Sequence, residues 1–344
     1  VAQWPLQDQV AWANATTKGD IFDGSGSAAH WRAPTCRLVE QAVGRFLGWL
    51  IDEELRDIRP LPNCIDPETV RSYCRRLEGH VASVTAHGHI RDLVEYCRVA
   101  WPDLDRSPLQ RAERSLRWRA VPTKDKRSRL KPIHELVELG AALMDASKTI
   151  DHGDPRLPLT QYRDGFAIAF LALRPMRIRA FGSLLLGEHL IQSGDIWRIN
   201  IPPELSKTHR HWGADFPQSL VPALTEYLKR VRPQLLQLQG RWYSDPGRAL
   251  WISNDGSALK PKAMGEAITK RTGKAFGRPI SPHFFRDCAA TTLAHDSPEN
   301  VRLATPLLGH THPKMTEKHY NQACQLQAGR KHIDAMAKLR RSLR

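Results

Sequence analysis

The sequence predicts a mainly α-helical protein of two units, the second of which carries a small antiparallel sheet. In the first unit, apolar residues such as Val39, Val43 and Phe46 recur at helical spacing. In the second, Trp197, Ile199 and Ile201 alternate with polar residues, as in a half-buried strand. Between them, residues 111–131 hold nine Lys or Arg residues and two acids, which indicates a basic linker between the units.

Residues 31–120 are expected to form a helical domain. Its first helix carries the apolar spacing just described. The second begins at Asp66-Pro67, because Asp is a favoured N-cap and Pro is favoured at the first helical position. A third helix is expected through roughly 84–99, and a fourth begins at Ser107-Pro108. Residues 1–30 include GDIFDGSGSAA, and this Gly- and Ser-rich stretch predicts a flexible N-terminal arm.

The larger unit opens with helices expected at about 133–147 and 160–174. A Ser193-Gly194-Asp195 turn precedes the alternating strand, and a second strand fits within 206–217. The remainder is helical again, and one helix begins at Ser281-Pro282.

The C-terminal segment, KHIDAMAKLRRSLR, is a basic amphipathic helix with Ile333, Met336 and Leu339 at helical spacing. Two interpretations stay open: the helix packs on its own domain, or it docks on a neighbouring subunit. The expected organisation is an arm at 1–30, a helical domain at 31–120, a linker at 121–132, a larger domain at 133–330 and a terminal helix at 331–344.

The charge balance favours a polyanionic partner. The chain has 51 Lys and Arg against 36 Asp and Glu, a net charge of +15. Such a surplus usually reflects nucleic-acid binding, although solubility charge without a partner is an alternative. No apolar run is long enough for a membrane span. The six cysteines are scattered without a CxxC pair, which predicts reduced thiols in a cytoplasmic protein. No Cys/His spacing indicates a metal site.

Two segments could carry chemistry on phosphate. In SPHFFRD, His283 and Arg286 lie three residues apart just inside a helix N-terminus, where free N–H groups and the helix dipole favour an anion. Such a pair alone arises by chance on many helices. In LLGHTHPKMTEKHY, His310 lies on a turn and Tyr320 follows ten residues later beside Lys318 and His319. A tyrosine in such polar surroundings is either a surface residue or a functional one.

Two further residues complete the candidate set. Arg177 lies in the apolar stretch ALRPMRIRAFGSLLL, and arginine is rarely buried without a counter-charge. A structural ion pair and a bound phosphate both explain it. Lys207 lies at the start of the second predicted strand or on the hairpin before it, where a lysine is ordinarily just solvated.

Together these residues resemble the tyrosine recombinase (phage integrase) family. The order of that family's catalytic residues is matched by Arg177, Lys207, His283, Arg286, the Leu308-Gly309-His310 motif and Tyr320. The resemblance covers residues 160–325 by motif and the whole chain by layout. It implies a helical core-binding domain followed by an α+β catalytic domain with a small antiparallel sheet.

This sequence departs from the family pattern at two positions. Ala180 stands where many members have an acidic residue, three positions after the first arginine, and Asp287 follows the second arginine, where His is common. Arg174 and Arg179 lie close enough to Arg177 to compete for the role of first arginine. Any part played by Asp287 or Arg174 in catalysis stays open.

The resemblance implies an enzyme that cleaves and rejoins DNA through a 3′-phosphotyrosyl link to Tyr320. Arg177 and Arg286 would neutralise the phosphate, and His283 and His310 would donate hydrogen bonds to it. Lys207 is the candidate general acid for the departing 5′ oxygen. No metal, ATP or other cofactor is expected, because the arginines supply the positive charge and the protein–DNA link stores the bond energy.

Double-stranded DNA is the expected partner, held between the two domains as in a clamp. A homotetramer on paired sites is expected, with or without partner recombinases. The protein is expected in the cytoplasm, associated with the nucleoid. The host element could be a phage, a transposon or a chromosome resolution system. A type IB topoisomerase and a catalytically inactive DNA-binding protein are the alternatives. The expected phosphate contacts are Arg111, Arg114, Arg117, Arg119, Lys124, Lys126, Arg127, Arg129 and Lys131.

Overall fold

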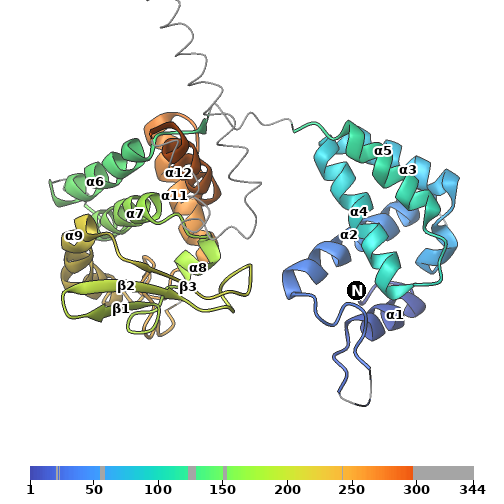
Figure 1. Ribbon diagram of the computed structural model, residues 1–344, viewed down its shortest axis with the longest axis horizontal. Coiled ribbons are helices and arrows are strands. Elements are labelled where there is room, and N and C mark those ends of the chain that lie inside the picture. Colours follow the sequence, from blue (N-terminus) through green and yellow to red (C-terminus); the bar gives the residue numbers. More distant parts are fainter. Residues whose placement is uncertain are drawn as a thin grey trace, which may run out of the picture. The chain divides into compact units, whose positions relative to one another are not determined.

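The structure is a computed structural model of the 344-residue chain. It describes residues 1–20, 22, 24–54, 59–122, 129–149, 153–241 and 243–296, without the side chains of residues 53, 54 and 294–296. The chain divides into two compact units, residues 1–125 and residues 126–344 (Figure 1). Among the described residues, no helix is long and apolar enough to cross a membrane.

All regular secondary structure in the described part of the first unit is helical. Its elements are α1 (Leu6–Thr16), α2 (Ala33–Glu54), the 3₁₀ turn η1 (Leu61–Cys64), α3 (Pro67–His80), α4 (Ser83–Ala100) and α5 (Ser107–Arg119). Val39, Val43 and Phe46 of α2 are buried in its core, which confirms the apolar face predicted from their spacing. Tyr73 of α3 packs edge-on against Phe46, with ring centroids 5.0 Å apart.

Helix α3 begins where the sequence predicts. The Asp66 carboxylate accepts hydrogen bonds from the backbone N–H groups of Glu68 at 2.9 Å and Thr69 at 3.0 Å. The Thr69 hydroxyl also donates to it, at 2.6 Å. This hydroxyl is the main cause of a lowered pKa of Asp66, and the backbone donors add to it. The cap therefore satisfies N–H groups that a helix start leaves without partners.

The prediction of a flexible arm over residues 1–30 is wrong. Trp4 and Trp12 are buried, Trp12 as part of α1, and both pack against Tyr96 of α4 with ring centroids 5.7 Å apart. The chain after α1 also returns to the unit, since the Ala28 N–H donates to the Ala15 carbonyl at 2.8 Å. The Gly and Ser content suggested mobility, whereas burial of two tryptophans provides the energy that orders this segment.

A buried carboxylate fixes α1 further. Asp8 is fully buried and accepts hydrogen bonds from the Leu61 N–H at 2.9 Å and the Tyr96 hydroxyl at 2.9 Å. The Trp101 indole donates to it at 3.1 Å. Since a buried carboxylate without donors is costly, these three bonds specify how α1 lies against the rest of the unit.

The second unit is built around α7 (Figure 1). Its elements are α6 (Ile133–Thr149), α7 (Arg156–Leu173), α8 (Ile178–Gly182), β1 (Leu190–Ser193), β2 (Ile196–Ile201), β3 (Trp212–Asp215), η3 (Gln218–Leu220), α9 (Val221–Glu226), the π-helical turn η4 (Tyr227–Val231), α10 (Arg232–Leu236), α11 (Pro261–Phe276) and α12 (Pro282–Asp296). Helix α7 contacts α6, α10, α11 and α12, and Figure 1 shows it between α6 and the sheet. The helices predicted at 133–147 and 160–174 are thus confirmed as α6 and α7.

Two glycines let α6 and α7 approach closely. A Cβ atom added at Gly140 would lie 2.6 Å from the Gly165 carbonyl oxygen, and one added at Gly165 would lie 2.6 Å from the Gly140 oxygen. Both distances are shorter than van der Waals contact. Glycine at the crossing therefore brings the two backbones together.

The sheet is an antiparallel meander in the order β1-β2-β3. Gly194 turns β1 into β2 with a φ of 60°, as the Ser193-Gly194-Asp195 pattern predicts. Ile199 pairs with Leu190 on one side and Ala214 on the other, and its side chain is buried. Strand β3 lies within the predicted range 206–217, so the small antiparallel sheet is confirmed.

Buried aromatic rings connect the sheet to α8. Phe170 of α7 packs edge-on against Phe216 beyond β3 at 4.8 Å and against Phe181 of α8 at 5.3 Å. The indole N–H of Trp251 donates to the Phe181 carbonyl at 2.7 Å. These contacts hold the short helix α8 in one place, which matters because Arg177 immediately precedes it.

Candidate active site

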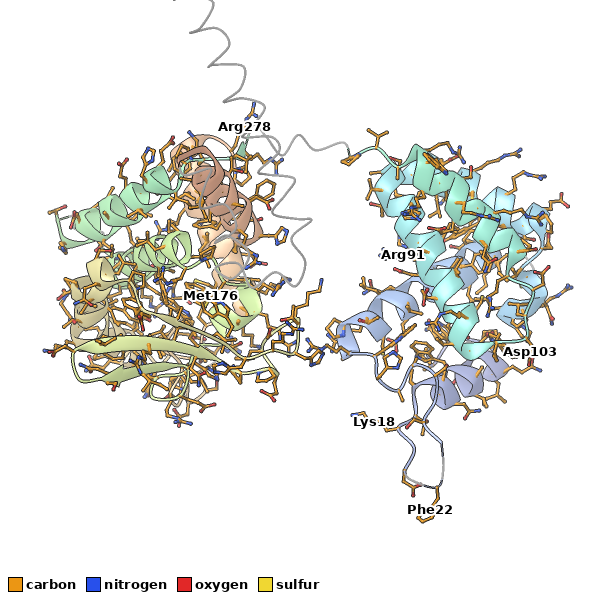
Figure 2. All side chains as sticks on the ribbon, viewed as in Figure 1. Lys18, Phe22, Arg91, Asp103, Met176 and Arg278 are labelled. Carbon is orange, nitrogen blue, oxygen red and sulfur yellow. The ribbon has the colours of Figure 1, made fainter. Side chains whose placement is uncertain are left out.

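Arg177 is the N-cap residue of α8. The turn that precedes it contains Met176, labelled in Figure 2. Helix α8 lies close to the start of α11: a Cβ atom added at Gly182 would lie 2.7 Å from the Pro261 Cα. The Arg177 side chain is half-buried, and this burial lowers the pKa of its guanidinium.

Arg286 projects from α12 toward the same turn. Its side chain is only 6% exposed, and its Nη1 donates a hydrogen bond to the Pro175 carbonyl at 2.7 Å. Burial and then repulsion from Arg177 lower the pKa of Arg286 to about 10, and Asp287 partly offsets them. The fold therefore places two guanidinium groups close enough to repel each other.

This arginine pair suits an anion with several oxygens. Within the described ranges, no carboxylate forms an ion pair with Arg177. The two like charges repel each other, and an anion bound beside both of them relieves the repulsion. The non-bridging oxygens of a phosphodiester match two forked guanidinium donors.

A second buried arginine shows the contrasting arrangement. Arg163 of α7 is 5% exposed, and its Nε and Nη2 donate to the Asp164 carboxylate at 3.0 and 2.7 Å. Arg271 of α11 donates to the other oxygen of Asp164 at 3.0 Å. This neutralised network fixes α7 against α11 and has a structural role. No local sequence pattern predicts this network, because Arg271 lies more than a hundred positions after its partner Asp164.

Arg174 and Arg179 lie close to Arg177 in the sequence and could also be the first catalytic arginine of the family pattern. Arg174 donates from Nε to the Asp215 carbonyl at 3.0 Å and from Nη1 to the Leu173 carbonyl at 3.0 Å. Arg179 is exposed. Of the three, Arg177 is the one whose charge lowers the pKa of Arg286. Arg177 therefore fits the anion site best.

His283 lies in the first turn of α12, on the helix that carries Arg286. Its side chain is exposed, so it is free to reach a ligand. A helix start also offers backbone N–H groups without helical partners. His283 and Arg286 thus lie just inside a helix N-terminus, as the sequence predicts.

Lys207 lies in the turn between β2 and β3, and its side chain is exposed. The turn around it is ordered: the Thr208 N–H donates to the Ser206 hydroxyl oxygen at 3.3 Å, and the two hydroxyls lie 2.9 Å apart. His209 has a φ of 51°, in the left-handed region. Among the described residues, no contact joins Lys207 to the arginine pair, so its catalytic role stays a prediction.

The expected DNA-contact residues fall into three groups. Arg111, Arg114, Arg117 and Arg119 are exposed on α5. Arg129 and Lys131 belong to the second unit and lie over the rings of Phe284 at 5.9 Å and Phe276 at 5.0 Å respectively. The other expected contacts, Lys124, Lys126 and Arg127, lie outside the described part of the chain. The predicted catalytic residues His310 and Tyr320 and the segment 331–344 also lie outside it. Within the described part, no group of three or more His, Cys, Asp or Glu side chains could hold a metal ion.

A model of the phage integrase family matches residues 138–326, which is more than half of the chain and includes every predicted catalytic residue. The chain belongs to the phage integrase family. A comparison with curated protein sequences finds no match.

Solved structures of tyrosine recombinases share the fold of this phage integrase family member. The XerH site-specific recombinase bound to difH is 15% identical, with a TM-score of 0.57 over 86% of this chain and 78% of that one. The Tn1549 transposon integrase in complex with circular intermediate DNA is 13% identical, with a TM-score of 0.53 over 94% and 98%. A lambda integrase dimer bound to a COC′ core site is 12% identical, with a TM-score of 0.53 over 86% and 90%. The predicted fold class and family are confirmed.

Proposed function

We propose that this phage integrase family member is a site-specific DNA recombinase that cleaves and rejoins strands through a 3′-phosphotyrosyl link. The observation that carries the proposal is the arginine pair. Buried Arg286 is held at the Pro175 carbonyl beside Arg177, and a phosphodiester would neutralise both charges. The similar structures are a recombinase and two integrases in complex with DNA, which supports the same substrate class.

The reaction follows from the charge distribution. The Tyr320 oxygen attacks phosphorus, a P–O bond to tyrosine forms, and the bond to the 5′ oxygen of the DNA breaks. Arg177 and Arg286 stabilise the negative charge that develops on the non-bridging oxygens. A cationic site also favours the phenolate form of tyrosine, whose proton leaves to solvent. Lys207 donates a proton to the departing 5′ oxygen, so the products are a protein–DNA link and a free 5′-hydroxyl.

Rejoining is the reverse reaction with a different strand. An incoming 5′-hydroxyl attacks the phosphotyrosine, and Tyr320 leaves. His283 and His310 donate hydrogen bonds to the phosphate in both directions. Because the link conserves the energy of the phosphodiester bond, the cycle needs neither ATP nor a metal ion. The arginines neutralise the charge that a metal ion neutralises in other phosphoryl-transfer enzymes.

A suicide substrate tests the chemistry. Nicked duplexes with a randomised core lose a short fragment after cleavage, which traps any covalent protein–DNA adduct. Tyr320→Phe should abolish the adduct and keep DNA binding. Arg286→Ala should lower cleavage by at least about a hundredfold, the range seen when one transition-state donor is removed, with a modest loss of binding. Arg179→Ala is the matched control, because this exposed arginine follows Arg177 by two residues, and it should cleave normally.

Two results would contradict the proposal. An adduct formed by Tyr320→Phe would show that another residue is the nucleophile, and normal cleavage by Arg286→Ala would remove the arginine pair from the reaction. Relaxation of a supercoiled plasmid that lacks a specific site would favour a type IB topoisomerase over a recombinase.

The assembly is part of the proposal. The first unit and the second would hold duplex DNA between them, and four copies would join two sites, with residues 331–344 docked on a neighbouring subunit. Light scattering of the full chain with trapped DNA should give a mass of four chains and two duplexes. Removal of residues 331–344 should leave cleavage of one duplex and reduce the tetramer.

A further inference from the structure

Trp118 near the C-terminal end of α5 is 91% exposed, a larger fraction than any other large apolar side chain in the described part of the chain. Tryptophan has one of the largest apolar surfaces of any side chain, and it is usually mostly buried. Its indole contributes nothing to the core of the first unit. A side chain exposed to this degree is therefore a candidate for contact with a partner.

The backbone around Trp118 is firmly held. Leu116, two residues earlier, is buried, and Arg119 pairs with Glu78 of α3 at 2.7 Å. Beyond the helix, the Ser83 hydroxyl bonds both the N–H and the carbonyl of Val121 at 3.1 Å. The indole is thus presented from a fixed helix end, which reduces the entropy cost of contact with a partner.

The surface around Trp118 is strongly basic. Arg114 and Arg111 precede it by four and seven residues and share its helix face. Within the described ranges, neither Arg114 nor Arg117 forms an ion pair, and Glu113 is engaged by His87 at 2.7 Å. Helix α3 packs beside α5, and Figure 2 shows nitrogen-tipped side chains along this side of the first unit.

We propose that Trp118 contacts duplex DNA directly, with its indole packed against sugars and base edges while Arg111 and Arg114 hold phosphates. The inference rests on the proposed function for the identity of the partner. Apolar contacts to base edges are an established part of groove recognition, and arginines position the backbone. A second copy of the chain is disfavoured, because a symmetric contact would bring the same basic surface against itself.

The dependence of binding on salt separates the two kinds of contact. The probe is a mixed-sequence duplex of about three helical turns, and the full chain is titrated at several salt concentrations. Trp118→Ala should weaken binding about tenfold at each salt concentration, an effect typical of one lost aromatic contact, with an unchanged slope of log K against log salt. Trp118→Phe should recover most of the affinity. Arg114→Ala should reduce the slope by about 0.9.

The matched control is Leu6→Ala, because Leu6 is also an exposed apolar residue, at 74%, on α1. It should bind like the wild type. All variants should melt like the wild type, since the changed side chains are exposed.

Two results would overturn the inference. One is wild-type affinity of Trp118→Ala for the duplex. The other is a change in the oligomeric state of Trp118→Ala without DNA, which would assign Trp118 to a protein contact. If Trp118→Ala binds normally while the Tyr320 adduct still forms, only this inference fails. If the wild type binds the duplex through Trp118 but never forms an adduct, only the proposed reaction fails.

Discussion

Replacing Arg286 with Met, which is similar in length and uncharged, should cost the DNA-free protein little stability although the side chain is almost fully buried. Desolvation and the neighbouring Arg177 charge lower the pKa of Arg286 from its usual value to about 10, which corresponds to ~3 kcal/mol of unfavourable free energy in the charged form. The substitution relieves this cost and also removes the interactions of the guanidinium, among them the hydrogen bond to the Pro175 carbonyl, each a loss of ~1 kcal/mol or somewhat more. The free energy of unfolding should therefore change by no more than ~1 kcal/mol.

Arg163→Met is the matched comparison. Arg163 is 5% exposed and Arg286 is 6% exposed, but Arg163 donates two hydrogen bonds to the buried carboxylate of Asp164. After the substitution, Arg271 is the one arginine of this network that still bonds the Asp164 carboxylate, and the free energy of unfolding should fall by ~3 kcal/mol. Two equally buried arginines of one unit should therefore differ clearly in their response to the same substitution.

Calorimetry of the full chain measures both effects. The transition of the second unit is identified as the one that Arg163→Met lowers, by about 8 °C, and Arg286→Met should shift it by less than about 4 °C. Added inorganic phosphate should stabilise the wild type and have less effect on Arg286→Met, because a ligand stabilises the state that binds it. If Arg286→Met lowers the transition as Arg163→Met does, the idea that Arg286 is held against an unfavourable charge is wrong.

Three further predictions concern other positions in the two units. Gly182→Ala should displace α8 and lower cleavage more than Gly265→Ala, because the added Cβ would lie 2.7 Å from Pro261 in the first case and 3.6 Å from its nearest neighbour in the second; equal cleavage rates would contradict this. Asp66→Ala should destabilise the first unit by about 1 kcal/mol, whereas Asp66→Asn keeps most of the cap. Because the pKa of Asp66 is lowered from 3.8, the Asp66→Ala loss should be complete above that pH and shrink as the pH falls through the lowered value, which melting curves between neutral and acid pH would show. Burial raises the pKa of Cys288 to about 11, so peptide mapping after iodoacetamide treatment at neutral pH should find this thiol unmodified in the folded chain.

The elements that the sequence predicts well are those decided by neighbouring residues. Asp66 caps α3 because its own side chain reaches the next two N–H groups. The strand around Ile199 follows from alternation, and its turn follows from Gly194. In each case the physical cause lies within a few residues, so the pattern shows in one sequence.

The parts that the sequence did not predict depend on distant residues. Helix α1 is ordered by Tyr96 and Trp101, which bind Asp8 from about ninety residues away. At the end of the Gly- and Ser-rich stretch, Ala28 is buried and the Ser27 hydroxyl donates to the Val99 carbonyl, and no local pattern predicts these contacts.

The candidate site shows the same division. Family order predicted Arg177 and Arg286, but it did not show that the Pro175 carbonyl holds Arg286 at the turn before Arg177. It also left Arg174 as a rival first arginine, and the two are separated by the bonds from Arg174 to Asp215 and Leu173 and by the effect of Arg177 on the pKa of Arg286. Residue identities come from the motif, whereas their mutual geometry depends on how α8 and α12 pack.

The most direct test of the central claim is to identify the residue that becomes linked to DNA. The purified chain is incubated with the nicked, randomised duplexes, the trapped complex is digested with protease and nuclease, and the modified peptide is sequenced by mass spectrometry. The proposed reaction predicts a nucleotide joined to the Tyr320 oxygen through its 3′-phosphate, with a yield that is much lower in Arg286→Ala. A link to any other residue, or a 5′-phosphate link, would contradict it.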